Sequence, residues 1–173
     1  MFTFRTEAQT AAYNEVGSML REYYGETVWA SDDAPTYWIS YGSAAVGITV
    51  HDRGDSEAYL RIFSWVLYGP RDEEDLARFL VQTNAKMRIG AFAIDAAGDI
   101  EFAYGLTGDG LTKSRLCDAV TTVVITADEW DDTLQARFGG LRHLDKVRAM
   151  SVPVDFERAL DQAGLRLQVD GEA

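Results

Sequence analysis

The chain has 173 residues, of which 47% are hydrophobic, and it carries a formal net charge of −12. This length fits one domain with a sizeable core, so the fold needs no disulfide or metal staple. The negative charge argues against direct binding to nucleic acid and against docking on anionic membranes. Cys117 is the only cysteine, which excludes an intramolecular disulfide and fits a reducing compartment.

The N-terminal sequence MFTFRTEAQT has no basic start followed by an apolar run, so we expect no secretory signal peptide. No stretch of the sequence approaches the length of a membrane span. We therefore expect a cytoplasmic protein that does not act at a membrane.

The first half of the sequence predicts one helix followed by four strands. Residues 6–24 repeat apolar residues at helical spacing behind a Thr6–Gln9 capping box, and Gly25 ends the run. Four β-type runs follow, separated by short turn sequences that favour antiparallel pairing. These runs are residues 26–31, 36–41, 44–51 and 57–68. The fourth run is apolar on both faces, which predicts a central strand or one covered on both sides.

The second half predicts helix, hairpin and helix. Residues 72–87 predict a helix with Asp72 as its N-cap and an acidic first turn. Residues 90–106 alternate around a turn and predict a β-hairpin. Residues 112–138 keep a helical period through the β-favouring VTTVVIT, so we interpret them as one helix. Beyond Gly139, the spacing of Phe156, Ala159, Leu160 and Ala163 predicts a short helix at about 154–163.

The predicted fold class is therefore α+β, an antiparallel sheet flanked by helices in the order α-β-β-β(-β)-α-β-β-α. We expect one domain over residues 1–138 and a C-terminal extension over 139–173. Short connections and the absence of an internal repeat support a single α+β unit.

No motif in the sequence predicts catalysis, a metal or a cofactor. His51 beside Asp52 has no serine or cysteine in a catalytic motif to assist, and we expect it, like His143, at the surface. Two histidines do not make a His-rich metal site. The glycines of TGDGL lack the P-loop lysine pattern, so we expect no phosphate cradle. Cys117 is expected to be a buried, inert thiol.

Aromatic residues are the most informative feature. Tyr37 and Trp38 are adjacent in a predicted strand and point to opposite faces of the sheet. Either helices cover both faces, or one face is an exposed apolar patch of the kind that marks protein interfaces. In the 90–106 hairpin we expect the large side chains either to pack the core or to anchor a partner. The small side chains on its other face would let a helix or a second subunit approach the hairpin closely. The candidate partner-binding residues are Tyr37, Trp38, Trp65, Phe92, Phe102 and Tyr104.

Residues 76–134 resemble the YbjN family of bacterial proteins. The resemblance rests on the helix ending in LVQTNAKM, the GAFAID strand, its return strand DIEFAYGL, and a long helix that closes with Ala127-Asp128 before Trp130. It implies the fold of type III secretion chaperones, which are commonly dimeric, cytoplasmic and acidic, and which bind extended segments of partner proteins without performing chemistry.

We therefore expect a non-enzymatic, chaperone-like adaptor, as a homodimer, that binds another protein through apolar surface and sheet edges. The acidic charge favours a basic partner, and a DNA- or RNA-binding protein is one such partner. The alternative is a small-molecule sensor or regulatory domain with a pocket under the aromatic sheet.

Overall fold

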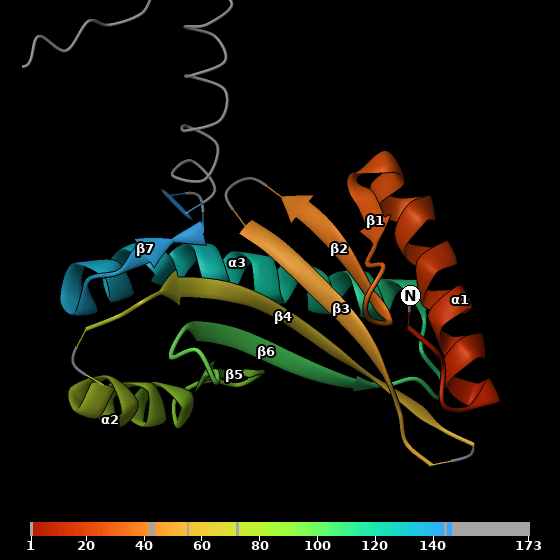
Figure 1. Cartoon of the computed structure of the whole chain (residues 1–173), viewed down its shortest axis with the longest axis horizontal. Coiled ribbons are helices and arrows are strands. Elements are labelled where there is room, and N and C mark those ends of the chain that lie inside the picture. Colours follow the sequence, from red (N-terminus) through yellow and green to blue (C-terminus); the bar gives the residue numbers. More distant parts are fainter. Residues whose placement is uncertain (1, 42–43, 55, 72, 144, 147–173) are drawn as a thin grey trace, which may run out of the picture.

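The computed structural model describes residues 2–41, 44–54, 56–71, 73–143 and 145–146. It is built around one antiparallel sheet with the strand order β1-β2-β3-β4-β6-β5, and a short strand, β7, also pairs with β4 (Figure 1). The strands are β1 (Val28–Ala30), β2 (Thr36–Tyr41), β3 (Ala44–Asp52), β4 (Ala58–Tyr68), β5 (Ala91–Ile94), β6 (Ile100–Thr107) and β7 (Leu141–Arg142). The helices are α1 (Glu7–Tyr24), the 3-10 turn η1 (Gly25–Thr27), α2 (Glu73–Asn84) and α3 (Lys113–Phe138). The predicted α+β order is confirmed.

The ends of α1 follow from its capping residues. The Thr6 hydroxyl accepts a hydrogen bond from the Gln9 amide at 3.1 Å, while the Gln9 side-chain oxygen accepts one from the Arg5 amide at 2.9 Å. Gly25 ends the helix with a φ of +63°, a conformation that other residues rarely adopt. The Gln9 side-chain Nε2 donates to the Val50 carbonyl at 2.8 Å, which fixes α1 against β3.

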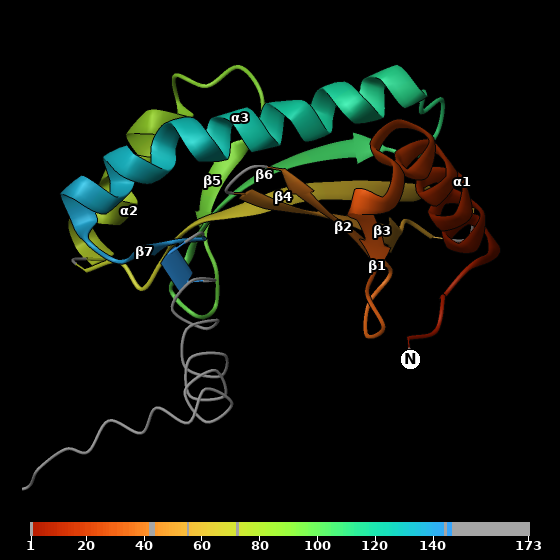
Figure 2. The ribbon, with the colours of Figure 1, turned by 90° about the horizontal axis from the view of Figure 1, so that it is seen from above.

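Helix α3 forms through the β-favouring run because its buried residues recur at helical spacing. The Thr112 hydroxyl accepts from the Arg115 amide at 3.3 Å and begins the helix. Figure 2 shows that α3 lies across one face of the sheet, with α1 and α2 toward its two ends. The core is formed between α1, α2 and α3 and this covered face, where Val46, Ile48, Leu60 and Ile62 are fully buried.

Strand β4 differs in one respect from a regular alternation of side chains. Its pairing with β6 shifts between Trp65 and Leu67, as at a β-bulge, which changes the face of the residues that follow. Leu67 is fully buried in the core, whereas the ring of Tyr68 lies 6.2 Å from that of Trp65. Strict alternation along residues 57–68 predicts that Leu67 shares a face with Trp65, and the shift in pairing makes this prediction wrong. The prediction of a central strand is confirmed.

Helix α2 ends at Asn84, three residues before the boundary that the apolar stripe predicts. The Asn84 side chain leaves the helix end and pairs with the backbone of β5. Its amide donates to the Phe92 carbonyl at 2.9 Å, and its oxygen accepts from the Phe92 amide at 2.8 Å. The side chain thus satisfies two backbone groups of an edge strand and connects α2 to the sheet.

Replacing Asn84 with alanine should lower the free energy of unfolding by about 2 kcal/mol, because both polar groups of Phe92 lose their partner. Urea unfolding followed by circular dichroism measures this change. Gln82→Ala, at an exposed position of the same helix, is the control and should change stability by less than about 0.5 kcal/mol. Equal effects of the two substitutions would show that the Asn84 pairing does not stabilise the fold.

Some predicted features lie outside the described residues. These are the Asp72 cap and the C-terminal segment 147–173 with its predicted helix at 154–163.

Candidate functional site

The sheet face opposite α3 is the candidate site, and we call it the open face. In the described part of the chain no helix packs on it (Figure 2). The strand registers place one row of its residues straight across the sheet. In the order of the strands this row is Trp29, Trp38, Gly47, Phe63, Ala103 and Ala91. Large aromatic side chains therefore gather at one end of the row and small ones at the other.

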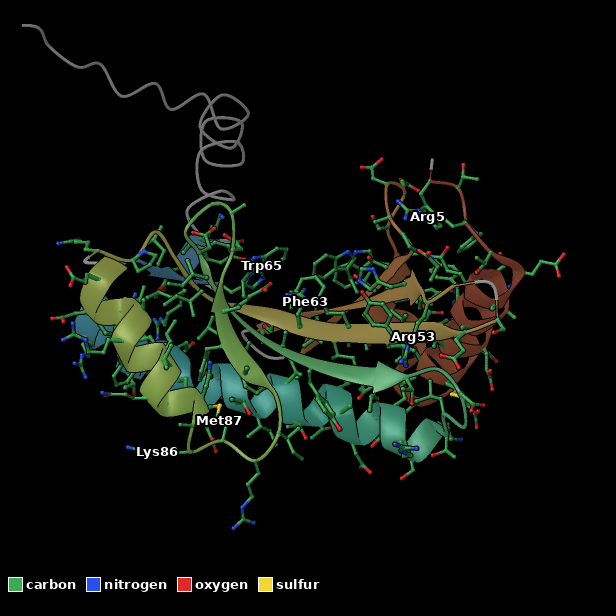
Figure 3. The ribbon with its side chains drawn as sticks, turned by 90° about the horizontal axis from the view of Figure 1, so that it is seen from below. Arg5, Arg53, Phe63, Trp65, Lys86 and Met87 are labelled. Carbon is green, nitrogen blue, oxygen red and sulfur yellow. The ribbon has the colours of Figure 1, made fainter. Side chains whose placement is uncertain are left out.

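The aromatic end carries five large side chains, which we call the aromatic ridge: Trp29, Trp38, Phe63, Trp65 and Tyr68. The rings of Trp38 and Trp65 stack with centroids 5.6 Å apart and an interplanar angle of 14°. Phe63 packs edge-on against both, at 5.5 Å and 5.3 Å. Figure 3 shows Phe63 and Trp65 on the side of the sheet away from α3. Trp29 is 46% exposed at the sheet edge and Trp38, Trp65 and Tyr68 are partly exposed, whereas Phe63 is only 7% exposed.

Gly47 makes the ridge possible. A Cβ atom at this position would lie 2.6 Å from the Phe63 ring and 3.0 Å from the Trp38 ring. The two aromatic rings therefore occupy the space above β3 that a side chain would fill. A glycine in the middle of a strand commonly marks such a close approach.

The other end of the open face is a strip of small residues on β5 and β6: Ala91, Ala93, Ala103 and Gly105. Three of them are exposed, which leaves the backbone of the hairpin open to close contact. Between strip and ridge, Arg61 forms an ion pair with Glu101. The Arg61 guanidinium also lies 4.6 Å from the centroid of the Phe63 ring. The face thus combines apolar bulk, a neutralised ion pair and accessible backbone.

Two turns project from the sheet on the side of the open face, one at each end (Figure 2). The β1–β2 turn carries Asp32 and Asp33, which are both exposed. The β5–β6 turn carries Asp95 and Asp99. The Trp65 indole donates to the Asp95 carboxylate at 3.2 Å, which joins this turn to the ridge.

The Asp95 carboxylate also organises its turn, since one of its oxygens accepts from the amides of Ala97 at 2.8 Å and Asp99 at 3.0 Å. Burial acts to raise the pKa of Asp95, but the hydrogen bonds from the Asp99 amide, the Trp65 indole and the Ala97 amide outweigh it and lower the pKa. Asp95 is therefore an anion at neutral pH, and the open face has acidic residues at both ends.

The structure divides the six predicted partner-binding residues. Trp38 and Trp65 lie in the aromatic ridge, whereas Tyr37, Phe92 and Phe102 are in the core, with exposures of 2%, 4% and 1%. Of the two roles predicted for the large hairpin residues, the structure therefore shows core packing for Phe92 and Phe102. Tyr104 is partly buried on the covered face, where it lines a shallow cleft with Ile89 and Leu106.

Both histidines are less exposed than the sequence predicts. His51 stacks on Tyr59 with centroids 4.7 Å apart, and its Nε2 is buried with no hydrogen-bond partner among the described residues. His143 lies at the end of the ridge, where its Nδ1 is 3.0 Å from the Tyr68 hydroxyl. Burial lowers the pKa of His143, and the nearby Lys146 ammonium lowers it further. Cys117 is buried as predicted, and burial raises the pKa of its thiol.

The lowered pKa of His143 predicts a pH dependence of stability. The unfolded chain takes up the proton near pH 6.5, whereas the folded protein does so only at lower pH. Stability contributed by neutral His143 is thus fully present above pH 6.5 and falls as the pH drops below it. Unfolding in urea at pH 7.5 and 5.5 should show a smaller loss of stability for His143→Asn than for the unchanged protein. An identical loss in both proteins would exclude this role of His143.

Three clefts on the described surface lie away from the ridge. One of them, of about 220 Å³, lies between α1, β2 and α3 and is lined by Tyr23, Tyr24, Ile39, Val120, Thr121, Val124 and Ile125. A polar cleft lies beside the start of α1, and a smaller one holds Tyr104. None of the three is lined by ridge residues, so none is the pocket under the aromatic sheet that a sensor function predicts.

Among the described residues no group of three or more histidine, cysteine, aspartate or glutamate side chains is arranged to hold a metal ion. No helix in this part of the chain has the length and apolar character required to cross a membrane.

A family described as "T3SS (YopN, CesT) and YbjN peptide-binding chaperone 1", TY-Chap1, matches residues 11–146. The chain belongs to the TY-Chap1 family. This confirms the resemblance to YbjN and to type III secretion chaperones. The match covers every strand of the described sheet, the helices α2 and α3, and α1 from residue 11 onward. The family is described as a peptide-binding chaperone, which confirms the general prediction of a protein-binding role.

A comparison with solved structures supports the TY-Chap1 fold. A chain in the crystal structure of the ExsC–ExsE complex matches with a TM-score of 0.56 at 16% sequence identity. The match covers 70% of this chain and 95% of that chain. No curated protein matches the sequence.

The candidate set omitted four residues of the site, namely Trp29, Gly47, Phe63 and Tyr68. The signal for Gly47 and Phe63 was present in the sequence. The connections between β2, β3 and β4 are short, and short turns fix the register of antiparallel strands. That register places Trp38, Gly47 and Phe63 in one row. Tyr68 joins the ridge through the bulge in β4, which no sequence pattern indicates.

Proposed function

We propose that this TY-Chap1 protein binds a segment of another protein on the open face of its sheet and catalyses no reaction. The observation that carries the proposal is the aromatic ridge. Trp38, Phe63 and Trp65 form a packed cluster on a face that no helix covers in the described residues. Tryptophan and tyrosine are the side chains that most often dominate binding energy at protein interfaces.

The shape of the face supports a segment rather than a globular partner. The ridge supplies rigid apolar anchor points, and the small-residue strip beside it allows a helix or strand to approach the sheet closely. A helix laid across such a face buries one apolar stripe and leaves its polar side in solvent.

The acidic turns support a basic partner. Asp32 and Asp33 lie at one end of the open face and Asp95 and Asp99 at the other, while the net charge of the chain is −12. Complementary charge accelerates encounter and selects against acidic segments. Proteins that bind DNA or RNA are basic and belong to this class of partner.

An array of synthetic 15-residue peptides tests this proposal. The peptides vary independently in the number of apolar residues at helical spacing and in the number of flanking lysines and arginines. We expect the purified protein to retain peptides with an apolar stripe and basic flanks, and to lose them in the Trp38→Ala variant. Retention that ignores the apolar stripe, or that is unchanged in Trp38→Ala, would contradict the proposal.

We also propose that the protein is a homodimer, as the resemblance implies. The supporting observation is the pair of exposed apolar side chains at the β5 edge, where Asn84 already takes both backbone groups of Phe92. Ile94 on this strand is 39% exposed, and Ile89 before it is 47% exposed. Sedimentation velocity should give a dimer for the unchanged protein and a monomer for Ile94→Lys. A monomer at all concentrations would exclude the dimer.

A further inference from the structure

The described chain ends at one end of the aromatic ridge. Strand β7 pairs with β4 at Leu67 and Tyr68. The Lys146 ammonium lies 3.5 Å from the centroid of the Tyr68 ring, and His143 contacts the Tyr68 hydroxyl. Arg142 holds this end of the described chain in place through hydrogen bonds to Asp145 at 2.8 Å and Asp132 at 2.6 Å. Residues 147–173 thus begin beside the ridge.

We infer that residues 147–173 of this chain occupy the open face in the free protein and must leave it before a partner segment binds. The inference rests on the proposed function, because it concerns the regulation of the same face. The family match ends at residue 146, so this segment is an addition to the family fold.

The segment has sufficient length to cover the ridge. The ridge extends from β4 across β3 and β2 to β1, a distance of about 15 Å at about 4.8 Å per strand. Residues 147–173 span up to about 90 Å when extended, and the predicted helix at 154–163 alone is about 15 Å long. The helix can therefore lie across the whole ridge with residues to spare on both sides.

The apolar residues of the segment match the aromatic ridge. Phe156, Leu160 and the two alanines at 159 and 163 recur at helical spacing and form one apolar stripe. Residues 147–173 carry three arginines and five acidic residues, so the match to the face rests on this stripe and not on charge. An apolar stripe is also what the proposed partner segment presents to the ridge.

Occupancy by a tethered segment lowers the apparent affinity for a partner. A short linker gives the tethered segment an effective concentration of about 1 mM at its site. A segment that binds the face with a dissociation constant of about 100 μM would thus weaken partner binding about tenfold.

The four tryptophans of the full-length chain provide a direct readout. A nitroxide spin label is attached to Asp161→Cys in a Cys117→Ala background, and the indole N–H signals are recorded by NMR. We expect the label to broaden the signals of Trp38 and Trp65. Trp130 packs against Phe92 and Phe79 on the covered side and should stay sharp. The substitutions Phe156→Asp and Leu160→Asp should restore the broadened signals. Broadening of no indole signal, or of all four equally, would overturn the inference.

Binding of the tightest array peptide to the full-length chain separates this inference from the proposed function. We expect about tenfold tighter binding to the Phe156→Asp/Leu160→Asp variant, and no change for Gln162→Asp, which adds charge away from the apolar stripe. Equal affinity in all three proteins would overturn the inference and leave the proposed function standing. Broadening of Trp38 and Trp65 without binding of any peptide would overturn the proposed function and the regulatory role together.

Discussion

Replacing Trp38 with alanine is expected to weaken peptide binding by about 30-fold or more, the effect of removing an interface residue that contributes about 2 kcal/mol. Trp38 stacks on Trp65 and packs against Phe63, so its loss breaks the ridge in the middle. Isothermal titration calorimetry with the tightest array peptide measures the change. The fold should persist, because the ring lies on the open face and the core beneath the sheet is unchanged.

Val81→Ala is the matched control for this experiment. Val81 is 69% exposed on α2, so its truncation also removes an exposed apolar side chain, but one away from the ridge. We expect the peptide affinity of this variant to equal that of the unchanged protein. A similar loss of affinity in Trp38→Ala and Val81→Ala would show that the peptide does not recognise the ridge.

Replacing Phe102 with alanine is expected to lower the free energy of unfolding by about 3–5 kcal/mol. Phe102 is 1% exposed and packs edge-on against Phe92 at 5.1 Å beneath the sheet. Its truncation leaves a cavity between β6 and the helices, and the loss is a large part of the stability of an ordinary domain. Urea unfolding monitored by circular dichroism measures the change.

Ala103→Ser is the control that shows whether the loss of stability depends on the buried position of Phe102 or follows from any substitution in β6. Ala103 is the next residue of β6 but lies on the open face, opposite Phe63 in the sheet. We expect this variant to lose less than about 1 kcal/mol. If Phe102→Ala were as mild, the placement of this ring in the core would be wrong. Together with Trp38→Ala, the pair of variants distinguishes aromatic residues that hold the fold from those that bind.

The order of helices and strands could be predicted from the sequence because local patterns agree with the fold. Each of these patterns indicates one kind of local structure. The caps at Thr6 and Thr112 indicate helix starts, the glycine after α1 indicates a helix end, and the alternating residues of β3 indicate a strand. Element ends were less predictable where a side chain replaces a backbone partner, as Asn84 does at the end of α2. The bulge in β4 was also unpredictable, since it depends on pairing with β6.

The candidate site could be predicted only in part, because a strand pattern does not say which face helices will cover. Trp38 and Phe102 are both large aromatic residues in alternating strands, yet one lies on the open face and the other in the core. The difference is set by α3, which packs on one face of the sheet and leaves the other free of helices in the described residues. The role of Gly47 likewise appears only once Phe63 and Trp38 are placed across it.

The central claim is that a partner segment binds the open face, and the indole N–H signals of the four tryptophans test it most directly. The tightest array peptide is titrated into the isotopically labelled full-length protein. Our account predicts that the signals of Trp38 and Trp65 shift with saturation, while that of Trp130 on the covered side does not move. Saturable shifts confined to Trp130, or peptide binding with no shift at Trp38 and Trp65, would contradict it.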